Sequence, residues 1–175
     1  MQILKFIGLG FVGIIVLLLI FAAFIPNKYT ISVSETINKP KAEVFDYIKM
    51  IKNQEQYSIW ITQDSTVKVS YQNEDGKVGL IASWDNGKDN KGEQEITKLT
   101  DERVDVDLRF EKPFKDNQKA ATFVKEVSPM QTIVTNEFYG TTKWPMSLMS
   151  LIGKKIIKDA QTQNLKNLKA ILEKK

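Results

Sequence analysis

The N-terminal apolar run constrains the fold of this chain more than any other feature of its sequence. From Leu4 to Ile25 the only charged residue is Lys5, and Pro26 follows the run. About 20 apolar residues in a helix cross the ~30 Å hydrocarbon core of a bilayer. A soluble domain of a 175-residue chain does not normally place so long an apolar run in one element. The run therefore predicts a transmembrane anchor, residues 1–26, followed by one water-soluble domain, residues 27–175.

The alternative is a secretory signal peptide, which has a shorter apolar core of about 7–15 residues and a small residue at the cleavage site. Here the run is longer, and Phe24 stands where a small residue is needed after Ala22 and Ala23. We therefore expect an uncleaved, single-pass anchor. A short N-terminal tail before one span usually stays in the cytoplasm, and long domains translocate largely regardless of charge. This predicts a soluble domain outside the cytoplasm.

The absence of two residue types excludes most site chemistry. The chain has no cysteine and no histidine. Disulfides, cysteine nucleophiles, Ser-His-Asp triads and ordinary zinc sites are therefore impossible. No phosphate-binding loop, dinucleotide fingerprint or calcium loop is present either, so we predict neither a metal nor a cofactor. Any catalysis would have to use Asp, Glu, Lys or Tyr.

The net charge of +4 comes largely from the C-terminal segment. Residues 154–175 hold seven lysines against Asp159 and Glu173, whereas residues 27–153 are slightly acidic. The lysines are typical of a solvated helix face, and the alternative is a face toward anionic lipid. The chain has only two arginines and no basic-aromatic motif, so we predict no nucleic-acid partner. The sequence does not specify an oligomeric state.

Hydrophobic periodicity predicts the order of elements after the anchor. Residues 29–37 alternate as a half-buried strand, and Pro40 opens a helix over residues 40–51. Residues 52–60 form a second short helix or turn. Six strands then follow, separated by turns, at residues 65–71, 78–84, 93–99, 103–111, 118–127 and 131–139. Residues 140–153 are irregular or partly helical, and a long amphipathic helix ends the chain.

Consecutive strands that are not interleaved with helices are typical of an α+β fold with an antiparallel sheet. The strand at residues 103–111 is the clearest, with Val104, Val106, Leu108 and Phe110 on one face. The element long enough to cover that face is the final helix of about 21 residues, or ~31 Å. One helix on a curved sheet leaves interior space, which predicts an apolar cavity.

This order resembles the helix-grip fold of the START/SRPBCC superfamily, which includes the birch pollen allergen and polyketide cyclases. The resemblance rests on several local patterns: Ile37 to Ile48 with its Pro and Val-Phe pair, Trp60, Gly79 with Trp84, Thr132 to Thr135 before Gly140, and Leu165 to Lys169. Asn136 stands where many relatives carry Trp. The resemblance implies a curved antiparallel sheet of about seven strands wrapped on the C-terminal helix, but it does not imply one activity.

Eight residues are candidates to line the cavity. Seven of them lie on the predicted strands, and Trp60 ends the predicted short helix or turn. The eight are Trp60, Trp84, Leu108, Phe110, Phe123, Val134, Asn136 and Phe138. The aromatic residues could equally be ordinary core. The Asn136 amide falls on an apolar face, so it needs either internal partners or a ligand.

Three carboxylates are candidate acids or bases. Glu35 lies on the apolar parity of its strand, where enclosure would raise its pKa, although a solvated sheet edge is the simpler interpretation. Asp105 and Asp107 share the polar face of the strand at residues 103–111, so we expect both carboxylates to be solvated. No catalytic residue is assigned.

The leading hypothesis is a membrane-anchored domain, tethered by Leu4 to Ile25, that binds a lipid or other hydrophobic small molecule. One alternative is a cyclase- or hydrolase-type enzyme that uses Glu, Asp or Tyr. The other is a ligand-free stress-response or interaction domain with a filled core. A cavity below ~300 Å³ would favour the last of these.

Overall fold

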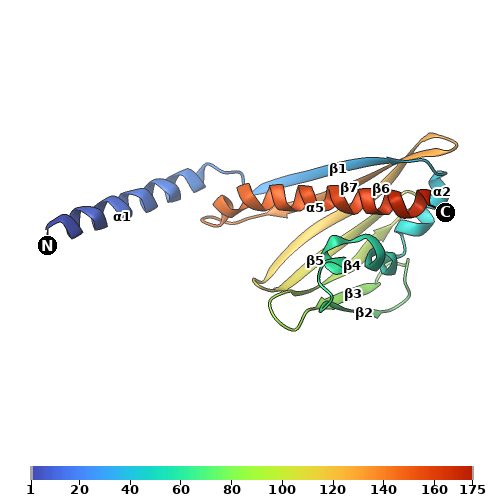
Figure 1. Cartoon of the computed structure of the whole chain (residues 1–175), viewed down its shortest axis with the longest axis horizontal. Coiled ribbons are helices and arrows are strands. Elements are labelled where there is room, and N and C mark those ends of the chain that lie inside the picture. The colour runs from blue at the N-terminus through green and yellow to red at the C-terminus, as the bar shows by residue number, and fades with distance from the viewer. Residues whose placement is uncertain (1, 175) are drawn as a thin grey trace.

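The computed structural model of the chain describes residues 2–174. One apolar helix is followed by a strand, a group of short helices, six further strands and a long C-terminal helix (Figure 1). In chain order the elements are α1 (Gln2–Ala23), β1 (Lys28–Ile37), α2 (Lys41–Ile48), η1 (Ile51–Asn53), α3 (Gln54–Tyr57), α4 (Ile59–Thr62), β2 (Lys68–Gln72), β3 (Ile81–Asp85), β4 (Lys91–Leu99), β5 (Arg103–Lys112), β6 (Asp116–Ser128), β7 (Gln131–Thr141) and α5 (Ser147–Glu173).

The strands form a single antiparallel sheet of seven in the order β1-β7-β6-β5-β4-β3-β2. Strands β2 to β6 are each paired with the next strand along the chain, as predicted for a meander. The first strand returns beside the last, with Lys28 opposite Thr141 and Ile37 opposite Thr132. Helix α5 runs along the inner face of the curved sheet beside β1 (Figure 1). The predicted α+β architecture is therefore confirmed.

The C-terminal helix is longer than predicted. It has 27 residues and begins at Ser147, whereas the sequence predicted an irregular or partly helical connection up to residue 153. Residues 147–153 contain two Leu, one Met and one Ile but no proline, so helix formation is favourable there. Their apolar side chains lie on several sides of the helix, and this obscured the amphipathic period on which the prediction depended.

Several other boundaries differ from the predicted ones. Strands β2 and β3 begin at Lys68 and Ile81, later than predicted, because local turns use the preceding residues. Asp64 closes one of these turns, since its Oδ1 accepts a hydrogen bond from Thr66 N at 2.9 Å and its carbonyl accepts one from Val67 N at 3.1 Å. The side-chain hydrogen bonds lower the pKa of Asp64. The first helix after the anchor ends at Ile48, and the short helix predicted after it is three short pieces, η1, α3 and α4.

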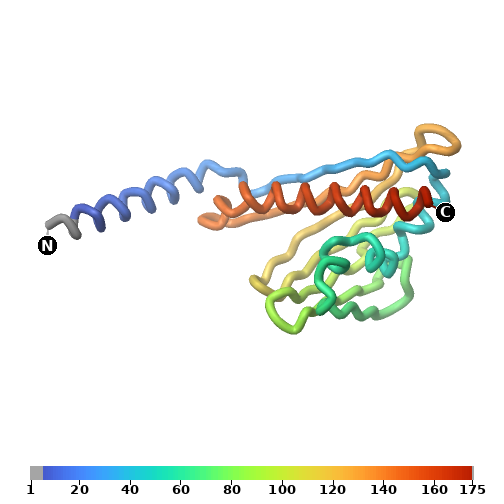
Figure 2. Tube along the Cα trace, in the orientation of Figure 1, coloured from blue at the N-terminus to red at the C-terminus, as the bar shows by residue number. Residues whose placement is uncertain are grey.

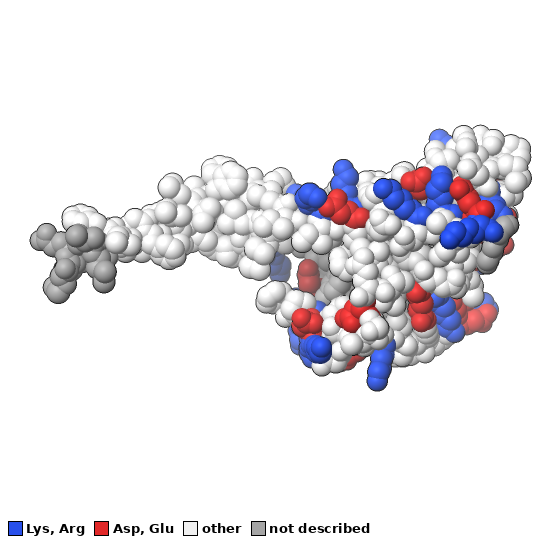
Figure 3. Space-filling model, viewed as in Figure 1, with Lys and Arg blue, Asp and Glu red and all other residues white. Residues whose placement is uncertain are grey.

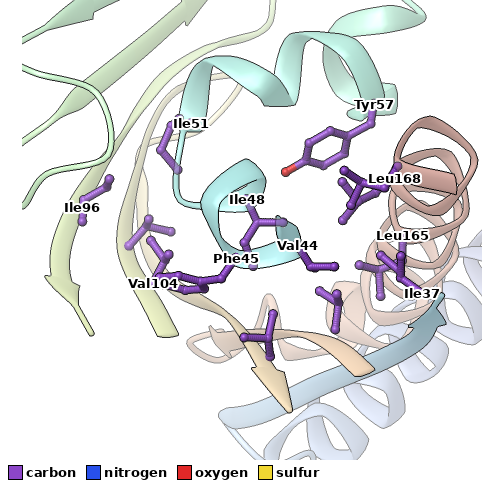
Figure 4. Packing of buried hydrophobic residues seen from close by; sticks show 14 of the residues in the cluster. Ile37, Val44, Phe45, Ile48, Ile51, Tyr57, Ile96, Val104, Leu165 and Leu168 are labelled. Carbon is purple, nitrogen blue, oxygen red and sulfur yellow. The ribbon is translucent and has the colours of Figure 1, made fainter. Parts of the chain in front are cut away.

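The hydrophobic core occupies the end of the molecule that lies farthest from α1. Helix α2 contributes Val44, Phe45 and Ile48, which pack between the sheet and Leu165 and Leu168 of α5 (Figure 4). All five side chains are buried. Among the described residues, α2 packs against β6 and β7 at this end, whereas α3 and α4 pack against α5.

Helix α1 extends away from the body, at the end of the long axis opposite the C-terminal end of α5 (Figure 2). Its segment Phe6–Ala23 is long and apolar enough to cross a membrane. The visible face of this helix carries no charged side chain along the part that the structure describes, whereas groups of charged side chains are spread over the body (Figure 3). Its last turn contacts the body: Trp144 Nε1 donates to Leu19 O at 3.1 Å, and Ser147 Oγ donates to Ala22 O at 2.8 Å.

Candidate functional site

A pocket of about 450 Å³ lies between the inner face of the sheet, the short helices and α5. Strands β2 to β7 form one wall. Helix α5 forms the opposite wall with Ile157, Gln161 and Asn164, and α4 adds Trp60 and Ile61 at one side. Such a space is expected where one helix and a few short turns cover half of a curved, seven-stranded sheet.

The aromatic part of the wall depends on a glycine. Gly92 of β4 is paired with Trp84 of β3 on one side and with Phe110 of β5 on the other. The two rings meet edge to face with their centroids 5.8 Å apart. A Cβ on Gly92 would lie 2.5 Å from the Trp84 ring and 2.6 Å from the carbonyl oxygen of Arg109. The absent side chain therefore allows the Trp84 ring to pack against the strand.

A chain of hydrogen bonds crosses the pocket wall at Asn136. Thr122 Oγ1 donates to Asn136 Oδ1 at 2.9 Å, and Asn136 Nδ2 donates to Gln161 Oε1 at 2.9 Å. These bonds join β6, β7 and α5. The sequence left open whether the Asn136 amide pairs within the protein or with a ligand, and these bonds show that it pairs within the protein. A primary amide carries a second N–H and a second lone pair, so Asn136 can still donate one more hydrogen bond and accept one more.

Other polar groups on the wall are also paired within the protein. Gln94 Nε2 of β4 donates to Gln54 Oε1 of α3 at 2.8 Å, and Trp84 Nε1 donates to Asn90 Oδ1 at 2.9 Å. Paired polar groups do not need water, so an apolar molecule can fill the pocket without leaving them unsatisfied.

Two tyrosines line the pocket, and both are held neutral. Burial raises the pKa of Tyr57, and the neighbouring Tyr47 adds to the effect. Burial also raises the pKa of Tyr71, as does the hydrogen bond from its hydroxyl to Glu55 Oε1 at 2.6 Å. A phenol with a raised pKa stays protonated at neutral pH, so neither tyrosine is a base there.

The structure brings together most of the residues that the sequence proposed as cavity lining. Six lie on the pocket wall: Trp60, Trp84, Leu108, Phe110, Asn136 and Phe138.

The other two, Phe123 and Val134, are not among the residues that line the pocket. Phe123 is on the outer face of β6, where the Arg103 guanidinium lies 5.2 Å from its ring centroid. Val134 is on the inner face of β7 but is fully buried in the hydrophobic core beyond the end of the pocket.

Sequence reasoning missed the contribution of α5. Ile157, Gln161 and Asn164 line the pocket at spacings of four and three residues, which return to one side of a helix. The signal in the sequence was that two polar residues, Gln161 and Asn164, interrupt the apolar stripe of that helix. Asn164 Oδ1 accepts a hydrogen bond from Ile59 N at 2.8 Å, and Asn167 Nδ2 donates to Tyr57 O at 3.0 Å. These two amides hold α3 and α4 against α5.

The three carboxylates considered from the sequence lie outside the pocket. Glu35 is at the junction of β1 and α5, where its Oε1 is 3.3 Å from Lys169 Nζ. Asp105 and Asp107 are on the outer face of the sheet, as expected, and pair with Arg103 at 2.8 Å and Lys119 at 3.1 Å.

Two charged residues contribute to the wall without placing their charges in it. Glu137 lies between the inward-facing Asn136 and Phe138, so its side chain points to the outer face. There its carboxylate accepts a hydrogen bond from the hydroxyl of Tyr139. Lys112 Nζ donates to Lys88 O at 2.9 Å at the surface. Among the residues that line the pocket, no carboxylate side chain is directed into it.

Comparison with known proteins shows similarity in structure rather than in sequence. No protein-family model and no curated protein sequence matches the chain. A Thermobifida fusca protein solved by NMR matches with a TM-score of 0.65 and 15% identity over 83% of this chain and 93% of its own. Ara h 8.0201 matches with a TM-score of 0.62 and 12% identity over 85% of this chain and 99% of its own.

A third solved structure, the protein TTHA0849 from Thermus thermophilus, gives a TM-score of 0.61 and 16% identity over 82% of this chain and 97% of its own. Identities this low show the fold alone. The matches span nearly the whole of each solved chain, and the common part is the curved sheet with its long helix. The chain therefore has the helix-grip fold, a curved antiparallel sheet of seven strands around a long C-terminal helix.

Proposed function

We propose that the chain is a membrane-anchored binding protein that holds one apolar small molecule, a lipid or another hydrophobic compound, in the pocket under α5. The pocket itself carries the proposal. Its volume of about 450 Å³ falls within the range of about 300–1,000 Å³ that is typical of sites for small ligands. A space of this size favours a ligand-binding domain over an interaction domain with a filled core.

The chemistry of the wall favours binding over catalysis. A cyclase or hydrolase of the kind considered from the sequence needs a carboxylate or an activated tyrosine at its substrate. The carboxylates considered lie on the outer face or at the β1–α5 junction, and Tyr57 and Tyr71 are neutral. Apolar side chains with a few paired amides instead suit a hydrophobic molecule that is held and released unchanged.

The tether in this proposal is α1, with the soluble domain outside the cytoplasm. The length and composition of Phe6–Ala23 support the anchor. The orientation rests on the short N-terminal tail. Because the chain has no cysteine, a Met130→Cys variant offers one thiol on the exposed β6–β7 turn. A membrane-impermeant maleimide labels it in intact cells if the orientation is correct, and labels it only after lysis if it is wrong.

The pocket proposal is tested by native mass spectrometry of the full chain purified from membranes, with solvent extraction of bound material. Ala120 lines the pocket, so Ala120→Phe places an aromatic ring in the ligand volume. A steric conflict of ~1.4 kcal/mol lowers affinity about tenfold. We expect the wild type to carry an apolar compound and Ala120→Phe to retain about a tenth as much or less.

The matched control is Ala170→Phe, the same change on the exposed face of α5, which should retain as much as the wild type. A wild-type protein that shows only its own mass, even after incubation with membrane lipids, contradicts the proposal and favours the filled-core domain. Equal retention by the two phenylalanine variants would mean that the compound is bound elsewhere.

A further inference from the structure

The N-terminal part of α5 exposes an apolar edge that the fold does not use. Met149, Ile152 and Ile156 are 57%, 63% and 54% exposed. On an α-helix, residues seven or eighteen apart return to nearly the same side, so Met149, Ile156 and Asn167 share one edge of α5. Asn167 contacts Tyr57 of α3, so this edge faces the short helices farther along the helix. At Met149 and Ile156 no such cover is present among the described residues.

The same edge borders the pocket. Ile157 lines the pocket, and its neighbour Ile156 is exposed beside it. Opposite α5 the wall continues through Lys112 and Pro113 at the end of β5 and through Trp60 of α4, which is 47% exposed. Figure 3 shows a recess in the surface below this part of α5. The mouth of the pocket therefore lies next to the apolar edge of α5.

Contacts with α1 fix the level of this edge relative to the proposed membrane span. Ser147 at the start of α5 is hydrogen-bonded to Ala22, and Trp144 to Leu19. Because α5 rises ~1.5 Å per residue, Ile152 lies ~8 Å and Ile156 ~14 Å beyond Ser147 along the helix. The polar interface of a leaflet extends about 5–8 Å beyond the hydrocarbon core. Ile152 therefore falls within that interface, and Ile156 just beyond it.

The residues around the edge suit the same environment. Trp144 is 54% exposed, and tryptophan is enriched where a membrane protein crosses the lipid–water interface. Lys143, Lys154, Lys155 and Lys158 follow in the connection and on α5, where cations favour an anionic leaflet. These lysines agree with the lipid-facing interpretation of the basic C-terminal segment.

We propose that Met149 and Ile152 lie in the interface of the leaflet next to α1, with Ile156 just beyond it, and that the pocket exchanges its ligand with that leaflet through the adjacent mouth. The inference rests on the proposed function, because it assigns the route by which the same pocket is filled. An apolar compound would then pass from lipid to pocket without crossing bulk water, which is the costly part of its path.

Nitroxide labels test the position of the edge in the full chain, since the sequence has no native cysteine to interfere. Ile152→Cys and Met130→Cys variants are labelled and placed in vesicles of phosphatidylcholine and phosphatidylglycerol. Met130 is a matched control, because it is 61% exposed but lies on the β6–β7 turn, far from α1. We expect collisions with oxygen to exceed those with a water-soluble nickel chelate at residue 152, and the reverse at residue 130.

Contact quenching of Trp84 by dibromostearic acid tests the route. Trp60→Phe and Trp144→Phe leave Trp84 as the single tryptophan on the pocket wall. The vesicle-bound protein is mixed with vesicles that carry the brominated acid. Adding Met149→Ser, Ile152→Ser and Ile156→Ser should slow quenching several-fold and leave its final extent unchanged. Adding Val127→Ser and Met130→Ser, at the far end, should change neither.

The outcomes separate this inference from the proposed function. Quenching that never develops in the Trp84-only protein overturns the proposed binding activity itself. Quenching that develops at the same rate in both serine variants, or a nitroxide at residue 152 that is as accessible to the nickel chelate as one at residue 130, overturns the leaflet route and leaves binding intact. Circular dichroism melting confirms that the variants are folded.

Discussion

Gly92 determines the shape of the pocket wall through the side chain that it lacks. Its neighbours across the sheet, Trp84 and Phe110, bring two large rings to the same part of the wall. A Cβ would meet both a ring and a backbone carbonyl oxygen, and the oxygen cannot move without shifting β5. The wall is thus fixed by backbone geometry as well as by side-chain packing.

Gly92→Ala should therefore destabilise the protein by ~1–3 kcal/mol, the usual cost of overpacking, and displace the Trp84 ring. Gly153→Ala is the control, because a Cβ at Gly153 meets nothing within 4 Å and alanine is favoured over glycine within a helix by ~0.5–1 kcal/mol. Urea unfolding gives the change in stability for each variant, and tryptophan emission in the Trp60→Phe, Trp144→Phe background reports the Trp84 ring. A neutral Gly92→Ala would mean that the strand relaxes freely and that the wall is not rigid.

The faces of individual residues could be predicted only where the core enforces alternation. In β5 the residues Val104, Val106 and Leu108 alternate with charged ones, and their inward placement was predicted correctly. In β6 the inward residues beside the pocket are Ala120 and Thr122, which are small or polar, so the pattern does not distinguish the two faces. For this reason Phe123, which lies on the outer face under Arg103, was included among the cavity candidates. Strand residues that face a pocket need not be large and apolar. The alternating hydrophobic pattern is therefore weakest beside the pocket, where it would be needed to locate the inward face.

At the scale of elements, the two halves of α5 have different surroundings. Its C-terminal half buries Leu165, Leu168 and Leu172 in the core and has the regular amphipathic period that the sequence predicted. Its N-terminal half contacts α1 through Ser147 and exposes Met149 and Ile152. This half could not be predicted as an amphipathic helix, because its apolar residues do not all face the protein.

Helix α5 also holds the short helices over the pocket. Helix α4 has no side-chain cap of its own, and Asn164 of α5 supplies one by accepting the hydrogen bond of Ile59 N. Asn164→Ala leaves that N–H without this partner in a position that is largely buried, so we expect a loss of ~1–3 kcal/mol of stability. Hydrogen exchange should show faster opening of α3 and α4.

The control for this prediction is Lys166→Ala on the exposed side of the same turn, which should change stability by less than about 0.5 kcal/mol. If Asn164→Ala is equally neutral and leaves exchange in α4 unchanged, α5 does not hold the cover of the pocket. In that case α4 would keep its place through packing of Trp60 and Ile61 alone.

At the scale of the whole molecule, the order of elements was enough to predict the fold. A strand, short helices, a six-strand meander and a final helix leave few ways to build one antiparallel sheet with one covered face. The place of the pocket along that sheet could not be predicted. It depends on where α2 stops filling the interior and on the length of α5, and neither boundary is marked by a strong sequence pattern.

The two ends of the resulting molecule differ in character. Along α5 the core residues Leu165, Leu168 and Leu172 lie toward the C-terminal end, and the pocket-lining residues Ile157, Gln161 and Asn164 precede them. Helix α1 lies beyond the N-terminal end of α5 (Figure 1). The pocket is therefore closer along α5 to the segment that is long and apolar enough to cross a membrane than the core is. Because the pocket and α1 lie close together, we propose that the hydrophobic ligand comes from the bilayer.

Photo-crosslinking in cells tests that claim most directly. Leucines are replaced globally by photo-leucine, an analogue of similar size that inserts into whatever contacts it on irradiation, and the peptides are then mapped by mass spectrometry. Leu108 lines the pocket, whereas Leu80 and Leu168 are 1% exposed in the core and serve as internal controls. We predict an apolar small-molecule adduct at Leu108 and only intramolecular links at the two core positions. Water adducts or intramolecular links alone at Leu108 would contradict the account.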